Sequence, residues 1–61
     1  MSAGEFNEGA VARWMRAHAD EYESATELAE ACADAFDVAD EGGPLDDETH
    51  WIWDLALEAV S

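Results

Sequence analysis

The sequence contains no lysine and only two arginines, Arg13 and Arg16, together with a single cysteine, Cys32. So few cations leave no basic patch of the kind with which proteins bind nucleic-acid phosphates. One cysteine forms no internal disulfide and completes no four-cysteine zinc site. The uncharged runs are far shorter than the roughly 20 residues that a membrane-spanning helix needs. These scarcities disfavour direct nucleic-acid binding, a disulfide scaffold and a membrane protein.

Acidic side chains are what the sequence has in excess. Sixteen Asp and Glu residues leave a formal net charge of -14 on 61 residues. In dilute buffer this charge opposes any compact state, whereas at molar salt the Debye length falls to about 3 Å and the repulsion is screened. The composition therefore predicts a protein adapted to a salt-rich cytoplasm and surrounded by diffuse salt cations. The N-terminal residues have no basic segment followed by an apolar stretch, which agrees with a cytoplasmic location.

Length and hydrophobicity together indicate one small folded domain over 1–61. A chain of this size buries only about 60 % of its unfolded surface, so its stability is marginal. Disordered acidic chains are poor in aromatic residues, but here 49% of the residues are hydrophobic and three are tryptophan. We therefore expect a folded core rather than a solvating tail.

Two amphipathic helices are expected in the first two thirds of the chain. Asn7 is a candidate N-cap for a helix over about 7–22, in which apolar residues recur at helical spacing. Ser24 followed by Glu27 forms a capping box for a second helix over about 25–37. The core candidates of the whole domain are Val11, Trp14, Leu28, Phe36 and Leu55.

The tripeptide Gly-Gly-Pro at 42–44 breaks the helical pattern and predicts a loop over 38–46. Asp46 or Asp47 is expected to cap a third helix over about 47–60. No segment has the β-branched, alternating pattern of a strand. The prediction is an all-α fold, a compact three-helix bundle with helix-turn-helix character at most.

The third predicted helix is apolar around most of its circumference, which normally means burial on more than one side. Trp51 and Trp53 lie about 200° apart around the helix axis, so they cannot both enter one core. Aromatic residues are enriched at protein interfaces, and we expect this helix to bind a protein partner or a second copy in a homodimer. The alternative to an interface is that one tryptophan packs in the core and the other is partly covered by the loop at 42–44. The predicted interface residues are Trp51, Ile52, Trp53, Leu57 and Val60.

A row of acids on the second helix supports a different function. Glu27, Glu30, Asp34 and Asp37 recur at steps of three, four and three and span about 15 Å. Such a row either mimics nucleic acid or is a solvated face.

The second and third helices also resemble a helix-turn-helix, although their connection exceeds the usual three or four residues. A nucleic-acid-directed regulator, whether acidic mimic or degenerate helix-turn-helix, is therefore the alternative to a protein-binding adaptor or regulator.

No catalytic or metal site is expected. His18 and His50 lie on different predicted helices without metal-binding spacing, and Cys32 falls on the core stripe, where a thiol is inert. The tripeptide at 42–44 lacks the lysine of a phosphate-binding loop. We therefore predict a protein that uses no metal ion or cofactor and catalyses no reaction.

Two segments carry a resemblance to known proteins. Residues 25–37, ATELAEACADAFD, and residues 46–56, DDETHWIWDLA, resemble the small acidic helical proteins of haloarchaea. In these proteins an Ala-rich helix with LAEA and a later Phe is followed by an acidic loop and a helix with a W-x-x-D-L-A pattern. The resemblance implies an origin in an archaeon that accumulates salt. That group is largely uncharacterised, so the resemblance implies no active site or substrate.

Overall fold

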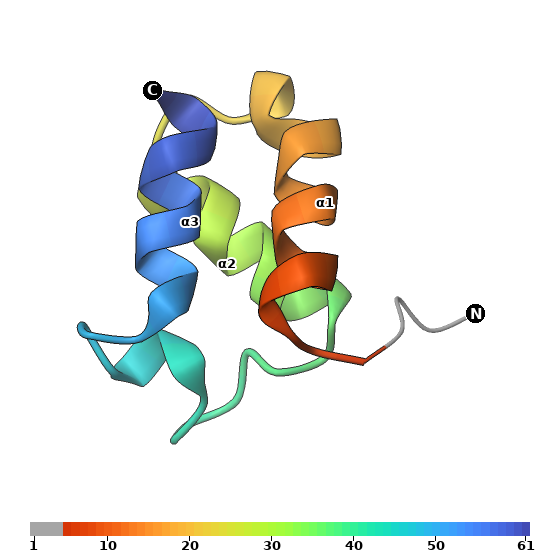
Figure 1. The fold of residues 1–61 in the computed structure, drawn as a ribbon. Coiled ribbons are helices and arrows are strands. Elements are labelled where there is room, and N and C mark those ends of the chain that lie inside the picture. The colour runs from red at the N-terminus through yellow and green to blue at the C-terminus, as the bar shows by residue number, and fades with distance from the viewer. Residues whose placement is uncertain (1–4) are drawn as a thin grey trace.

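The computed structural model describes residues 5–61, and in this part of the chain it contains helices and no strand. Three α-helices make up the fold, with two short 3₁₀ turns between them: α1 (Glu8–His18), η1 (Ala19–Glu21), α2 (Ala25–Ala35), η2 (Pro44–Asp46) and α3 (Trp51–Val60). α1 and α3 stand side by side and run in the same direction, while α2 crosses behind them (Figure 1). The predicted all-α three-helix bundle is therefore confirmed.

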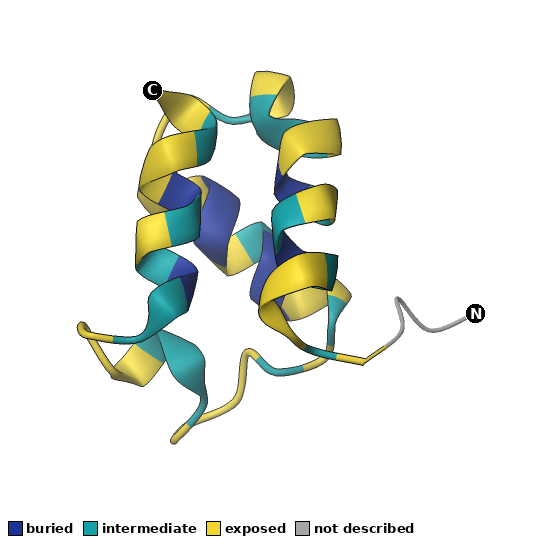
Figure 2. Ribbon diagram, in the orientation of Figure 1, coloured by how far each residue is buried: buried dark blue, intermediate teal, exposed yellow. Residues whose placement is uncertain are grey.

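The core lies where the inward faces of the three helices meet (Figure 2). Among the five core candidates, Val11 and Leu28 are fully buried, whereas Trp14, Phe36 and Leu55 are half-buried and pack around the centre. Small side chains occupy much of that centre, which lets the helices approach closely. The fully buried residues are Val11, Met15, Leu28, Ala29, Cys32, Ala33, Ile52 and Ala56.

Local hydrogen bonds set the starts of α1 and α2. Asn7 Oδ1 accepts from the Ala10 backbone N–H at 2.9 Å, and Ser24 Oγ accepts from the Glu27 N–H at 3.2 Å. The return bond of the capping box differs from the expected one, because Glu27 Oε2 accepts from the backbone N–H of Glu23 at 3.3 Å. Both N-caps therefore lie where the sequence predicts them, and the box closes one residue earlier.

α2 ends at Ala35, two residues before the predicted end, because the chain turns sharply there. Asp37 adopts a left-handed backbone conformation with φ of 61°. Its N–H donates to the Asp34 carbonyl at 3.1 Å, and the Val38 N–H donates to the Ala33 carbonyl at 2.8 Å. These two bonds form a Schellman motif, which usually has glycine at the position of Asp37. The motif ends the helix and takes Asp37 out of it.

α3 begins at Trp51, so the predicted start at 47 with an aspartate cap is wrong. Asp47 Oδ1 accepts from both the N–H and the hydroxyl of Thr49, at 2.9 and 2.7 Å. A short acidic side chain that bonds its own turn in this way competes with helix formation. The N-cap is instead His50, whose Nδ1 accepts from the Ile52 N–H at 3.1 Å.

The loop between α2 and α3 depends on its two glycines. Gly42 has a φ of 80°, a left-handed conformation that glycine adopts without strain. A Cβ at Gly43 would collide with the carbonyl oxygen of Val38. The turn allows η2 to lie against both α2 and α3, where Leu45 packs on the core.

Candidate protein-interaction surface on the third helix

The inner face of α3 belongs to the core and is not available to a partner. Ile52 and Ala56, four positions apart, have no exposed surface. Ile52 was among the predicted interface residues, and this part of the prediction is wrong. The sequence showed that α3 is apolar on several sides but not which side meets α1 and α2.

Trp51 lies in an aromatic cluster formed by Phe6, Phe36, His50 and Trp51. Phe6 stacks on Trp51 with ring centroids 5.1 Å apart and planes at 26°, and His50 lies 4.6 Å from the same indole. Phe6 also meets the Phe36 ring edge-on at 5.8 Å. Trp51 is therefore half-buried and already has aromatic neighbours within its own chain.

Trp53 is also half-buried, but it is held by the loop. Its indole N–H donates to the Asp47 backbone carbonyl at 3.0 Å, so the segment before α3 fixes its orientation. The prediction that the two tryptophans diverge agrees with these different surroundings. Neither of them enters the buried centre, and neither is fully exposed.

The most exposed apolar side chains lie on the last turns of α3. Leu57 is 58% exposed and Val60 is 37% exposed, and in residues 5–61 these are the large hydrophobic residues that reach solvent most. Trp53, Leu57 and Val60 are spaced i, i+4 and i+7 and share one face of the helix. We call these three residues the outer stripe. Asp54 and Glu58, both exposed, border it on one side.

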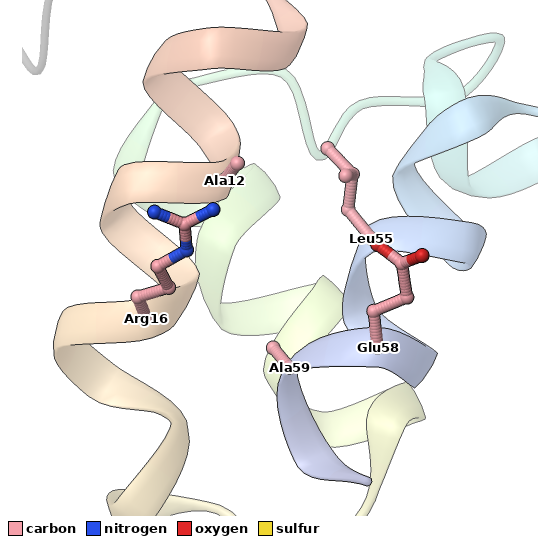
Figure 3. A pocket seen from close by; sticks show the side chains of 5 residues that line it. All are labelled: Ala12, Arg16, Leu55, Glu58 and Ala59. Carbon is pink, nitrogen blue, oxygen red and sulfur yellow. The ribbon is translucent and has the colours of Figure 1, made fainter.

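A groove of about 330 Å³ separates α3 from α1. Ala12 and Arg16 form its α1 wall, and Leu55, Glu58 and Ala59 form its α3 wall (Figure 3). The Arg16 guanidinium and the Glu58 carboxylate therefore belong to opposite walls. At about 100° per residue, Leu55 and Ala59 both lie roughly 160° around α3 from Leu57, so the groove and the outer stripe are on opposite sides of the helix, with Asp54 and Glu58 between them.

The acidic row on α2 is shorter than predicted. Glu27, Glu30 and Asp34 are exposed on the helix, but the Schellman motif removes Asp37 from their line. Glu27 also uses one carboxylate oxygen to accept from the Glu23 N–H. The row on the helix therefore contains three charges, and one of them supports the helix start.

The residues with reactive or metal-binding side chains are dispersed. Cys32 is fully buried, and this burial raises the pKa of its thiol to about 11, so the thiolate needed for nucleophilic chemistry is disfavoured. His18 Nδ1 lies 2.8 Å from Glu21 Oε2, and its ring packs 4.2 Å from Trp14. His50 is the cap of α3. Within the described residues, no three His, Cys, Asp or Glu side chains come together as a metal site.

Phe6 and His50 shape the start of α3 in ways that the sequence did not predict, since Phe6 covers Trp51 and His50 caps the helix. An apolar residue immediately before an N-cap commonly packs on the helix that follows, so the position of Phe6 before Asn7 was an available signal. No sequence signal indicated that His50 would replace Asp47 as the cap of α3. This choice depends on the hydrogen bonds of the folded turn.

None of the helices in the described part of the chain is both long and apolar enough to cross a membrane. Comparison with protein-family models, curated proteins and solved structures finds no match to this chain. The resemblance to haloarchaeal proteins therefore stays a prediction. The outer stripe and its acidic border are the features on which a functional proposal rests.

Proposed function

We propose that this chain is a small protein-binding module, an adaptor or regulator without catalytic activity, which binds its partner through the outer stripe of α3. The observation that supports this most is the 58% exposure of Leu57 beside the 37% exposure of Val60. Exposed apolar side chains that lie together on one face favour association. The half-buried Trp53 at the other end of the stripe adds an aromatic residue of the kind that anchors interfaces.

The occupant we propose is a different protein rather than a second copy. A stable interface buries about 800 Å² on each partner, which is roughly a fifth of the 4214 Å² surface of this chain. The outer stripe alone falls short of that area for any partner, and in a symmetric pair Asp54 and Glu58 of one copy would lie beside those of the other, a repulsion between neighbouring carboxylates that salt screens least. We therefore expect sedimentation at molar KCl to give a monomer. A tight dimer there would assign the stripe to self-association.

The proposal includes work in a salt-rich cytoplasm, which the acidic composition supports. Self-repulsion among the carboxylates opposes the compact state until salt screens it. We expect the helical circular dichroism signal to fall sharply below about 0.5 M KCl. Full helicity in dilute buffer would contradict the adaptation to salt without bearing on the outer stripe.

The test of the binding function compares three baits in a pull-down from lysate of the source cells at molar KCl. The double variant Leu57→Ser/Val60→Ser removes the exposed apolar side chains of the stripe, while Ala35→Ser changes an exposed position on α2. We expect one protein to be retained by the wild type and by Ala35→Ser, with or without nuclease, and lost with the double variant. Identical retention by all three baits would mean that the outer stripe is not the binding surface.

A nucleic-acid-directed role has less support. The connection between α2 and α3 runs over 36–50, and both arginines lie on α1 rather than on α3. The exposed acids Asp46, Asp47 and Glu48 precede α3, where they would face phosphates of the same sign. No observation favours the acidic mimic over a solvated face. Retention that disappears with nuclease in the same pull-down would reverse this order of preference.

A further inference from the structure

The surroundings of the outer stripe have one sign of charge. α3 contains no Arg or Lys, and its two acids, Asp54 and Glu58, are both exposed. At about 100° per residue, these two acids follow the apolar row along one side, four positions apart. The stripe is therefore an apolar row about 10 Å long with a parallel row of carboxylates beside it.

The two arginines do not neutralise this border. Both belong to α1, and the only ionic contact within 4.0 Å among residues 5–61 joins His18 and Glu21. Arg16 lies on the far wall of the α1–α3 groove, opposite Glu58. A partner that covers the stripe therefore meets two carboxylates that no cation among residues 5–61 holds in a salt bridge.

We infer that the partner segment is a basic amphipathic helix, whose apolar side covers Trp53, Leu57 and Val60 and whose Lys or Arg residues face Asp54 and Glu58. This inference rests on the proposed function and specifies the partner for that same surface. A helix matches the stripe because ridges at i, i+4 and i+7 pack into the grooves of another helix. The described part of the chain has no strand edge to which an extended peptide would add.

Local placement of the charges, and not the overall acidity, is what the inference requires. Any cationic peptide is attracted to a chain with a net charge of -14. A specific complex differs from this general attraction in two respects. It depends on the apolar stripe, and it depends on the two acids beside the stripe more than on acids elsewhere.

The experiment uses the full chain and two synthetic helical peptides of about 18 residues with one identical Leu face. One peptide carries Lys along the flank of that face and the other carries Glu, and binding is followed by fluorescence anisotropy at 1 M KCl. We expect the Lys peptide to bind at least tenfold more tightly than the Glu peptide. We also expect the substitutions Leu57→Ser/Val60→Ser to weaken binding of the Lys peptide at least tenfold.

A matched pair of charge variants separates local from overall attraction. Asp54→Asn/Glu58→Gln and Asp40→Asn/Glu41→Gln each remove two negative charges, but the second pair lies in the loop, away from the end of α3 (Figure 1). We expect the first pair to weaken binding of the Lys peptide about threefold, since at 1 M KCl only charges in direct contact escape screening, and the second pair to leave it unchanged. Circular dichroism confirms that each variant keeps the wild-type helicity.

The outcomes distinguish this inference from the proposed function. Equal losses from the two charge pairs, or a Glu peptide that binds as tightly as the Lys peptide, would overturn the basic partner while the stripe remains the binding surface. A Lys peptide that binds Leu57→Ser/Val60→Ser as well as wild type would contradict the stripe itself. If neither peptide binds at millimolar concentration, the helical occupant is wrong, and the pull-down with the stripe variants still decides the proposed function.

Discussion

The two halves of α3 are similarly apolar in sequence but differ in what covers them. In the first half, Phe6 stacks on Trp51 and the Asp47 carbonyl holds the Trp53 indole. In the second half, Leu57 is 58% exposed and Val60 is 37% exposed. The loop after α2 leads into the start of α3, where Phe6 also stacks on Trp51, whereas the last turns of α3 lie at the opposite end of the helix, near η1 (Figure 1).

This difference shows that an apolar helix surface becomes core only where another segment reaches it. The side of α3 that faces α1 and α2 is fully buried at Ile52 and Ala56, while Leu55 and Ala59 line the groove beside α1. On the outer side, the segment before α3 covers the first turns, whereas η1, which also contacts α3, leaves Leu57 and Val60 exposed. The uncovered part is the surface that we propose for binding.

The largest expected effect contrasts the inner and outer sides of α3. Ile52→Ala should destabilise the domain by about 2–5 kcal/mol, since it leaves a cavity at a fully buried position. Leu57→Ala should change the free energy of unfolding by no more than about 0.5 kcal/mol. Urea unfolding at 2 M KCl measures both values.

If Ile52→Ala does not fold, Ile52→Val gives the same comparison at a smaller expected loss of about 0.5–1.5 kcal/mol. An equal loss of unfolding free energy in the Ile52 and Leu57 variants would mean that the inner and outer sides of α3 do not differ in burial. A large loss at Leu57 in a monomer would show that this residue is part of the core.

An intermediate effect is expected at Phe6, which covers the first half of α3. Phe6→Ala should lower the free energy of unfolding by about 2 kcal/mol, because the ring loses contacts with Trp51, His50 and Phe36. In a background where Trp14 and Trp53 are replaced by Phe, the emission of Trp51 should shift to longer wavelength.

Leu57→Ala in the same background is the control for this fluorescence measurement. It lies on the uncovered half of α3 and should leave the Trp51 emission unchanged. An unchanged emission in Phe6→Ala would mean that Phe6 does not cover Trp51 in solution.

The smallest expected effect concerns the turn that holds the first half of α3. The hydrogen bonds from the Thr49 hydroxyl and N–H lower the pKa of Asp47 from its ordinary value of 3.8, with a smaller contribution from nearby His50. The lowered pKa means that the folded state favours the ionised form of Asp47. The ionised carboxylate therefore stabilises the fold at pH values above 3.8, and this stabilisation is lost as the pH falls through the lowered pKa of the folded state.

Thr49→Ala removes the hydroxyl donor and should move the pKa of Asp47 upward, towards its ordinary value. A titration of the Asp47 carboxyl carbon by NMR in 2 M KCl measures this shift, and Asp54 on α3 serves as the internal reference. A pKa that does not respond to the substitution would mean that the turn before α3 is not held by this hydrogen bond.

Several features of the fold were predictable because they depend on residues close in sequence. Helical spacing and the caps Asn7 and Ser24 indicated the starts of α1 and α2, and both caps accept the expected backbone N–H groups. The glycines at 42–43 indicated the loop, where one has a positive φ and a Cβ on the other would collide with a carbonyl oxygen. The interactions that decide these features span only a few residues of the chain.

The end of α2 and the start of α3 were predicted less well, although they too are local. The pattern of acids continued through Asp37, but the backbone reverses there and places Asp37 in a left-handed conformation. Asp47 has a side chain that caps helices, yet it bonds Thr49 in the turn and leaves the cap to His50. In both places two local arrangements compete, and the residue types alone do not distinguish them.

By itself the sequence determined an all-α chain of three helices, a strongly acidic surface and a third helix with more apolar surface than one core can cover. Only the tertiary structure decided which parts of that helix are covered. Ile52 faces α1 and α2, Trp51 meets Phe6 from the other end of the chain, and Leu57 and Val60 meet neither. The physical reason is that helical periodicity is encoded locally, whereas burial of a helix face requires contact with segments distant in sequence.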